Sequence, residues 1–169
     1  MRDALRSQDC LYTVLSRGLN SNEAQVCGAI VKYLLAPDDP EAVLDQMLST
    51  ATKIVSLTIT EKGYCASDLG AMKLDVTHPF VVHDTTNPES PKSALGFIVT
   101  ALSRRRAAGR PPFTVLSCDN LQGNGTTART LTLAMAAAMA PALGAAGEGL
   151  VPWLAQEVKF PNTMVDRIT

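Results

Sequence analysis

The sequence predicts an α/β fold with a mainly parallel sheet flanked by helices. Short apolar runs rich in β-branched residues alternate with helical patterns along the chain, and that alternation is typical of βαβ units. A chain of 169 residues with 46% hydrophobic and 18% charged residues also has the size and composition of one globular domain. A small α/β domain is therefore the expected architecture.

The first half of the chain predicts a strand, a helix and a second strand. Gln25–Leu35 begins like a strand. Pro37–Glu41 then supplies a cap, a proline for the first helical position and acidic residues for the first turn of a helix. That helix carries its apolar side chains at positions 43, 44, 47 and 48. Lys53–Thr60 (KIVSLTIT) follows as a β-branched run, and it predicts a strand that ends in polar residues.

The middle of the chain predicts a long loop followed by a helix. Cys65–Pro91 holds both histidines and three prolines without a sustained period, so we expect a lid-like loop with a short strand at Phe80–Val82. Ser93–Gly109 has apolar residues at i, i+3, i+4 and i+7, which predicts an amphipathic helix on a sheet face. Arg104–Arg106 fall in its last turn, where we interpret them as a solvated helix end interacting with the helix dipole.

The last third predicts a second buried strand and two helices. Phe113–Cys118 (FTVLSC) is the strand, and a polar Asp-Asn pair follows it. We expect a helix from about Thr126 to Ala140, and an amphipathic stretch over Leu150–Val158.

Composition excludes several partner classes. The 15 Lys+Arg against 16 Asp+Glu give a net charge of -1, which argues against a nucleic-acid binder. The longest apolar stretch, Leu131–Ala146, contains Pro141 and Gly144 and falls short of the ~20 residues that a bilayer span needs, so no membrane partner is expected. Four widely spaced cysteines without a CxxC pair indicate a reduced, cytoplasmic protein without a zinc site. The sequence indicates no oligomeric state.

Polar residues end both predicted strands. In parallel sheets, ligands bind beyond the carboxyl ends of the strands, because loops and helix N-termini meet there. We expect Glu61, Asp119 and Asn120 on one rim, where they supply a carboxylate for proton handling or ribose contact and an amide for an oxygen. The alternative is ordinary turn chemistry, in which Asp and Asn bond their own loop backbone.

Three other patterns are interpreted as structural. Gln122–Ala128 contains G-x-G-x-x-A, but Gly123 lies too far beyond the strand for a dinucleotide fingerprint, so a turn that leads into a helix is the better interpretation. His78 and His83 match no metal-ligand spacing, and we predict no metal site. Cys118 lacks the context of a nucleophile elbow and is expected to be a buried structural thiol.

Four blocks in one order resemble the mannitol dehydrogenase family of long-chain polyol dehydrogenases, which includes fructuronate and tagaturonate reductases. The blocks are Ile59–Tyr64, Pro91–Phe97, Ser117–Leu121 with Asn124-Gly125, and Phe160–Thr169. The resemblance implies a metal-independent, NAD-dependent oxidoreductase that interconverts a polyol and a ketose, such as mannitol and fructose, by hydride transfer. It also implies that residues 1–169 are a partial Rossmann-like cofactor domain, and that the mostly helical C-terminal catalytic domain of the family is absent from them.

The resemblance assigns roles to four residues. Asn120 resembles the amide that stabilises the substrate oxygen, where one positioned donor is worth roughly 3 kcal/mol. Thr60 and Glu61 resemble the strand end beside the nicotinamide, with Glu61 on a proton path to solvent. Asp166 resembles a substrate-hydroxyl contact, since a carboxylate accepts strong hydrogen bonds from polyol hydroxyls.

Two family motifs have no counterpart in these residues. The G-x-G-x-F-H loop of the family precedes the segment that Met1 begins, and no lysine here has Asn five residues later, as in K-x-x-x-x-N-x-x-H. We therefore expect an incomplete cofactor domain that is inactive by itself and exposes an unpaired sheet edge or apolar face. The alternatives are a fructuronate- or tagaturonate-reductase type of enzyme, and a non-catalytic remnant or binding module.

Overall fold

The computed structural model describes residues 2–19 and 21–165, and the chain divides into two units, residues 1–35 and 36–169. The first unit consists of a short helix and a hairpin. Helix α1 spans Arg2–Ser7, and strands β1 (Tyr12–Arg17) and β2 (Asn22–Cys27) pair antiparallel with Tyr12 opposite Cys27. The strand-like start predicted at Gln25 lies in β2 and ends at Cys27, since residues 28–35 take no regular structure.

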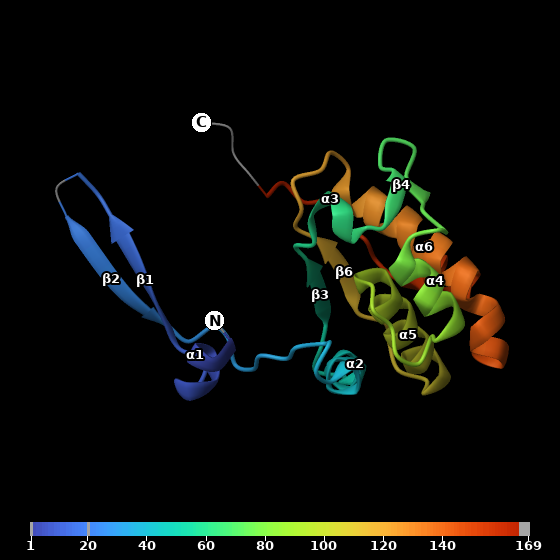
Figure 1. The fold of residues 1–169 in the computed structure, drawn as a ribbon, viewed down its shortest axis with the longest axis horizontal. Coiled ribbons are helices and arrows are strands. Elements are labelled where there is room, and N and C mark those ends of the chain that lie inside the picture. Colours follow the sequence, from blue (N-terminus) through green and yellow to red (C-terminus); the bar gives the residue numbers. More distant parts are fainter. Residues whose placement is uncertain (1, 20, 166–169) are drawn as a thin grey trace. The chain divides into compact units, whose positions relative to one another are not determined.

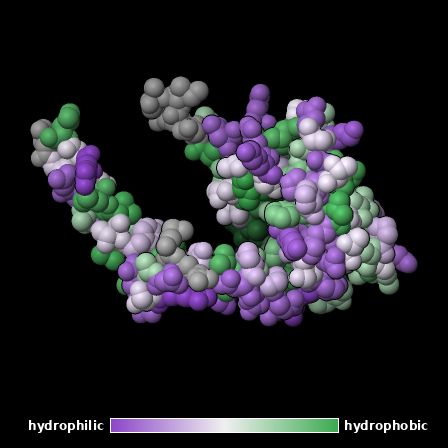
Figure 2. All heavy atoms as spheres, in the orientation of Figure 1, coloured by the Kyte–Doolittle hydropathy of each residue, from purple (hydrophilic) through white to green (hydrophobic). Residues whose placement is uncertain are grey.

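The hairpin of the first unit has almost no core. Most of its strand residues are exposed, and green spheres lie along its surface in Figure 2. A two-stranded hairpin is at best marginally stable alone in water. The apolar side chains of this unit that stay exposed are Leu11, Val14, Leu15, Leu19, Val26 and Val31.

The second unit is built around two parallel strands. Strands β3 (Ile54–Leu57) and β6 (Thr114–Ser117) pair in register, with Ile54 opposite Thr114, and Figure 1 shows them side by side. Both predicted strands are confirmed, each shorter than its apolar run. On the β6 side the ladder continues, because the N–H of Val115 donates to the carbonyl of Lys159 at 3.0 Å. On the β3 side, Ile54 is 57% exposed and no described strand pairs there.

Helices pack around this strand pair. Asp39 caps α2 (Pro40–Leu48) through the N–H of Ala42, which agrees with the cap predicted within Pro37–Glu41. Ser93 caps α5 (Ala94–Ala107) through the N–H of Gly96. Helix α6 is longer at both ends than predicted. The helices are α2 (Pro40–Leu48), α5 (Ala94–Ala107), α6 (Asn124–Leu143), the 3₁₀ turn η1 (Gly144–Ala146) and α7 (Leu150–Glu157).

Helix α6 is the central helix of the second unit and contacts α4 (Pro79–Thr86), α5, α7 and β6. Residues 124–146 form the one helical stretch of the described chain that is long and apolar enough to cross a membrane. Leu131, Met135 and Met139 of this helix are nevertheless fully buried within the unit. Its apolar character is that of a core helix.

Residues 65–91 are folded rather than a lid-like loop. A short helix α3 (Thr60–Gly63) precedes a small antiparallel pair, β4 (Ala66–Asp68) and β5 (Lys73–Leu74), and helix α4 (Pro79–Thr86) follows and contacts α6. The strand predicted at Phe80–Val82 is wrong. The His78-Pro79 pair starts a helix there, since the His78 ring accepts from the N–H of Phe80 and proline suits the first helical position.

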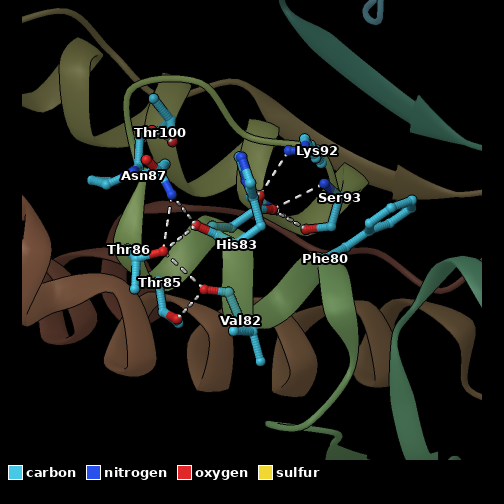
Figure 3. A network of polar contacts seen from close by, with 12 residues as sticks. Phe80, Val82, His83, Thr85, Thr86, Asn87, Lys92, Ser93 and Thr100 are labelled. Atoms are coloured by element: carbon cyan, nitrogen blue, oxygen red, sulfur yellow. Dashed lines mark hydrogen bonds and ion pairs between the residues drawn. The ribbon is translucent and has the colours of Figure 1, made fainter.

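A buried carboxylate explains why this segment folds. Asp84 is fully buried and accepts hydrogen bonds from the N–H groups of Lys92 and Ser93, from the Ser93 hydroxyl and from His83, at 2.7 to 3.0 Å (Figure 3). Gly96 leaves room for it, since a Cβ on Gly96 would lie 2.2 Å from Asp84 Oδ2. The end of α4 is thereby joined to the start of α5.

The three arginines that end α5 are not a solvated helix end. Arg104 pairs with Glu41 and Glu89, and Arg106 donates to the carbonyl of Glu148. Arg105 is 1% exposed, with its guanidinium on four backbone carbonyls. The sequence interpretation is wrong for Arg105 because three of those carbonyls, of Met47, Ser49 and Thr52, lie more than 50 residues away in the sequence.

Candidate functional site

The carboxyl ends of β3 and β6 open onto one cavity of about 360 Å³. Its six lining residues follow the two strands, three from each: Thr60, Glu61, Lys62, Asp119, Asn120 and Leu121. The two strands bring their polar ends together because they run parallel and in register, from Ile54 and Thr114 to Leu57 and Ser117. The expected rim of Glu61, Asp119 and Asn120 is therefore present.

Four side chains at this cavity are available to a ligand: the exposed ammonium of Lys62 and three that the sequence analysis singled out. Thr60, Glu61 and Asn120 are exposed, and no hydrogen bond to another described residue engages their side chains. They offer a hydroxyl, a carboxylate and an amide. That set can accept from and donate to a hydroxylated substrate, and the amide can stabilise a developing charge on oxygen.

Asp119 also lines the cavity, but both of its carboxylate oxygens are bonded to residues that follow the other strand. It is 6% exposed; its Oδ1 accepts from the N–H of Thr60 at 2.7 Å and its Oδ2 from the Tyr64 hydroxyl at 2.8 Å. The idea that Asp119 bonds its own loop backbone is thus wrong for this side chain. Its carboxylate joins the turn after β3 to the end of β6.

The Tyr64 hydroxyl stays protonated in this network. Burial, opposed by the hydrogen bond to Ser117 and reinforced by the Asp119 carboxylate, raises the pKa of Tyr64 far above its usual range. Because its one proton goes to Asp119, the Ser117 hydroxyl, 2.7 Å away, donates to the Tyr64 oxygen. The three groups form a directed chain of hydrogen bonds.

Asn124 holds the last described segment of the chain against the site. Its amide is 1% exposed, donates to the Asp119 carbonyl and to Thr163 Oγ1 at 3.0 and 2.8 Å, and accepts from the N–H of Thr163 at 2.9 Å. The Thr163 hydroxyl in turn donates to the carbonyl of Ser117 at 2.6 Å. A second cavity, of about 340 Å³, lies there between residues 119–123 and 163–165.

The glycine-containing segment leads into α6, as the sequence predicts, and its second glycine allows close packing at the start of that helix. A Cβ on Gly125 would lie 2.3 Å from the carbonyl oxygen of Pro161, so glycine is needed for a close backbone approach. The N–H groups of Gly125 and Thr126 already donate to Asn124 and Asn162 side chains. Those donors are occupied and cannot also cradle a phosphate.

Other candidate residues lie elsewhere or outside the described part. Asp166, the expected substrate-hydroxyl contact, lies outside the described residues. His78 caps α4 and His83 lies within it, and among the described residues no group of three or more His, Cys, Asp or Glu side chains can hold a metal. Cys118 is half-buried rather than buried.

Sequence reasoning missed the residues that organise the site. It assigned no role to Tyr64, Ser117, Asn124 or Thr163, although all four fall in blocks quoted for the resemblance. The signal available in the sequence was that polar residues follow each predicted strand at short intervals. Its meaning depends on contacts between residues more than 35 positions apart, such as Asn124 with Thr163 and Tyr64 with Ser117.

Comparison with known proteins gives one consistent family. The family model of the mannitol dehydrogenase Rossmann domain matches residues 1–169. Mannitol 2-dehydrogenase of Aspergillus terreus is 46% identical over 171 residues, with 100% of this chain and 32% of that protein covered. D-mannonate oxidoreductase of Escherichia coli is 46% identical over 166 residues, with 97% and 32% covered.

Solved structures agree with this result. Mannitol 2-dehydrogenase of Pseudomonas fluorescens, in a ternary complex with NAD and D-mannitol, superposes with a TM-score of 0.88 at 45% identity, over 99% of this chain and 32% of that one. A substrate-free D-sorbitol dehydrogenase superposes with a TM-score of 0.85 at 40% identity, over 95% and 32%. The chain thus spans about a third of the length of the proteins it matches.

Proposed function

The chain belongs to the mannitol dehydrogenase family, whose Rossmann domain it matches over residues 1–169. On this premise we propose that it is part of an NAD-dependent mannitol 2-dehydrogenase. The proposed reaction interconverts a sugar alcohol and a ketose, mannitol and fructose, by hydride transfer. One observation carries the proposal: the free side chains of Thr60, Glu61 and Asn120 meet at the carboxyl ends of two parallel strands, around one cavity.

The described residues fit the reacting end of the cofactor and substrate. A cavity of about 360 Å³ with a free hydroxyl, carboxylate and amide suits a nicotinamide beside a polyol carbon. The glycine-containing turn is internally bonded and does not suit the pyrophosphate. Bound NAD supplies the hydride acceptor.

The roles of the chain's own residues follow from their chemistry. Asn120 donates its amide N–H to the substrate oxygen, where charge develops as the hydride leaves the carbon. Thr60 contacts the nicotinamide end of the cofactor, and the exposed Glu61 carboxylate passes a proton to solvent. Asp166 accepts hydrogen bonds from substrate hydroxyls.

The decisive experiment measures NADH formation from D-mannitol by the complete gene product. We expect turnover, and we expect Asn120→Ala to lower kcat about 100-fold with little change in KM, because the amide acts mainly in the transition state. Turnover that survives Asn120→Ala unchanged contradicts the assignment. The 169-residue chain by itself is expected to show no mannitol oxidation, and turnover by the pure chain would contradict that.

A second candidate substrate class is a sugar acid. D-mannonate oxidoreductase of Escherichia coli is 46% identical to this chain, the same value as for the Aspergillus terreus mannitol 2-dehydrogenase. A fructuronate- or tagaturonate-reductase type of enzyme is therefore the alternative. Parallel assays with D-mannitol and D-mannonate decide between them by the ratio of kcat/KM, and activity with neither supports a non-catalytic binding module.

The setting that we propose is cytoplasmic, without a nucleic-acid or membrane partner. All four cysteines are free thiols, as expected in a reducing compartment. The balance of 15 Lys+Arg against 16 Asp+Glu argues against a nucleic-acid binder, and the apolar side of α6 is buried in the core of the second unit. Fractionation of cells that express a tagged copy tests the compartment.

A further inference from the structure

One buried hydrogen-bond chain connects the two strand ends that carry the exposed site residues. Tyr64 has no exposed surface, and its hydroxyl lies 2.7 Å from Ser117 Oγ and 2.8 Å from Asp119 Oδ2. The other carboxylate oxygen of Asp119 accepts the N–H of Thr60 at 2.7 Å. We propose that Tyr64 and Asp119 are positioning residues for the proposed reaction, which set the spacing between Thr60-Glu61 and Asn120 without touching substrate or cofactor.

The proposal explains an unusual backbone conformation at Thr60. Its φ is +58°, in the left-handed region, which a β-branched residue rarely adopts. Such conformations persist where surrounding contacts over-determine them, and they cluster at functional sites. The bond from the N–H of Thr60 to Asp119 is the contact that crosses from the other strand.

The proposal also follows from chain connectivity. Asp119 directly precedes Asn120, and Thr60 directly precedes Glu61. A single side chain therefore fixes the distance between a free amide on one strand end and a free carboxylate on the other. Because misplacement by about 1 Å can cost about 100-fold in rate, this spacing matters for hydride transfer.

Substitutions at Asp119 separate positioning from charge. Asp119→Ala removes both bonds, and we expect kcat of the complete gene product to fall at least about tenfold with a smaller change in KM. Asp119→Asn can keep the two contacts across the strand ends. The amide oxygen of the new side chain still accepts from the N–H of Thr60, and its NH₂ group donates to the Tyr64 oxygen. The Tyr64 hydroxyl then donates its proton to Ser117 instead. We expect this variant to retain activity within about threefold. Loss equal to that of Asp119→Ala would show that the charge itself acts, which overturns the proposal.

A double-mutant cycle tests whether Tyr64 acts through Asn120. We expect Tyr64→Phe to lower kcat about fivefold in the wild-type background and to have little further effect in an Asn120→Ala background, because the amide it positions is gone. A merely structural role would lower both backgrounds by the same factor, which would overturn the proposal. Thr132→Val is the matched control, since Thr132 Oγ1 is buried without a hydrogen-bond partner among the described residues. We expect its kcat to stay at the wild-type value.

A measurement without catalysis keeps this inference separate from the proposed function. Hydrogen exchange of the Thr60 amide should be at least about tenfold faster in Asp119→Ala than in the wild type and little changed in Asp119→Asn. An unchanged Thr60 exchange rate in Asp119→Ala overturns the positioning role even in an active enzyme. An inactive wild type with the expected exchange rates overturns the proposed function and leaves the network intact.

Discussion

One buried charged side chain forms hydrogen bonds at each end of the parallel strand pair, and the two side chains have different roles. At the amino ends, the guanidinium of Arg105 donates to the carbonyls of Met47, Ser49, Thr52 and Pro111, and its Cζ lies 5.0 Å from the centroid of the Phe113 ring. At the carboxyl ends, Asp119 accepts from the N–H of Thr60 and from the Tyr64 hydroxyl. At the amino ends a buried cation donates to backbone carbonyls, and at the carboxyl ends a buried anion accepts from two hydrogen-bond donors.

The difference lies in what surrounds each charge. Every hydrogen-bond partner of Arg105 is backbone, and it joins the end of α2 to the segments that enter both strands. Asp119 lines a cavity beside exposed side chains that have no partner among the described residues. We infer that substitutions at the amino ends change stability, whereas conservative substitutions at the carboxyl ends change function more than stability.

The largest effect is expected from Arg105→Met. Methionine keeps the apolar stem but leaves four carbonyls without their donor, so we expect the free energy of unfolding to fall by at least about 3 kcal/mol. Urea unfolding followed by circular dichroism measures it.

Arg104→Met is the matched control, one residue earlier on the same helix. Its partners Glu41 and Glu89 have side chains that are 57% and 74% exposed. Exposed ion pairs contribute little, so we expect a loss below about 1 kcal/mol. Equal losses in the two variants would remove the distinction between the buried clamp and the surface pairs.

A smaller effect is expected from Asn124→Ala at the carboxyl ends. The substitution removes the acceptor of the Thr163 N–H and the donor to the Asp119 carbonyl, and we expect a loss of about 2 kcal/mol. Segment 159–165 should become accessible to protease before the rest of the unit unfolds. Asn162→Ala, which removes one bond to the N–H of Thr126 from an exposed residue, should cost about 1 kcal/mol or less. Protease resistance of the segment in Asn124→Ala would contradict this role.

The contrast between the two ends also shows what the sequence can predict. The sequence predicts strands β3 and β6 from their apolar runs and helix α5 from the spacing of its apolar residues. It also predicts that Glu61 and Asn120 lie close together, because the carboxyl ends of parallel strands lie at the same edge of a sheet. Arg105 was misinterpreted because its carbonyl partners Met47 and Thr52 lie 58 and 53 residues away in the sequence. Helix α4 was not predicted, because the hydrogen bonds that Asp84 accepts from the N–H groups of Lys92 and Ser93 leave no periodic pattern in the sequence.

The smallest effect is a pH dependence confined to the carboxyl ends. Burial raises the pKa of Tyr64 above its unfolded value of about 10, so the folded state keeps the proton that the unfolded state releases. The stability from Tyr64 is therefore complete below about pH 10 and declines as the pH rises toward the folded pKa, by about 0.8 kcal/mol at about pH 10.5. Urea unfolding from pH 8 to 10.5 should show the stability gap between wild type and Tyr64→Phe narrowing by about that amount. Ser117→Ala leaves the tyrosine in place, so this variant should keep the decline in stability at alkaline pH. Arg105 stays charged over this pH range, so it adds no pH dependence at the amino ends of the strands. A gap that stays constant across this range would mean that the Tyr64 proton is not held by the fold, and the directed chain to Asp119 would lose its physical basis.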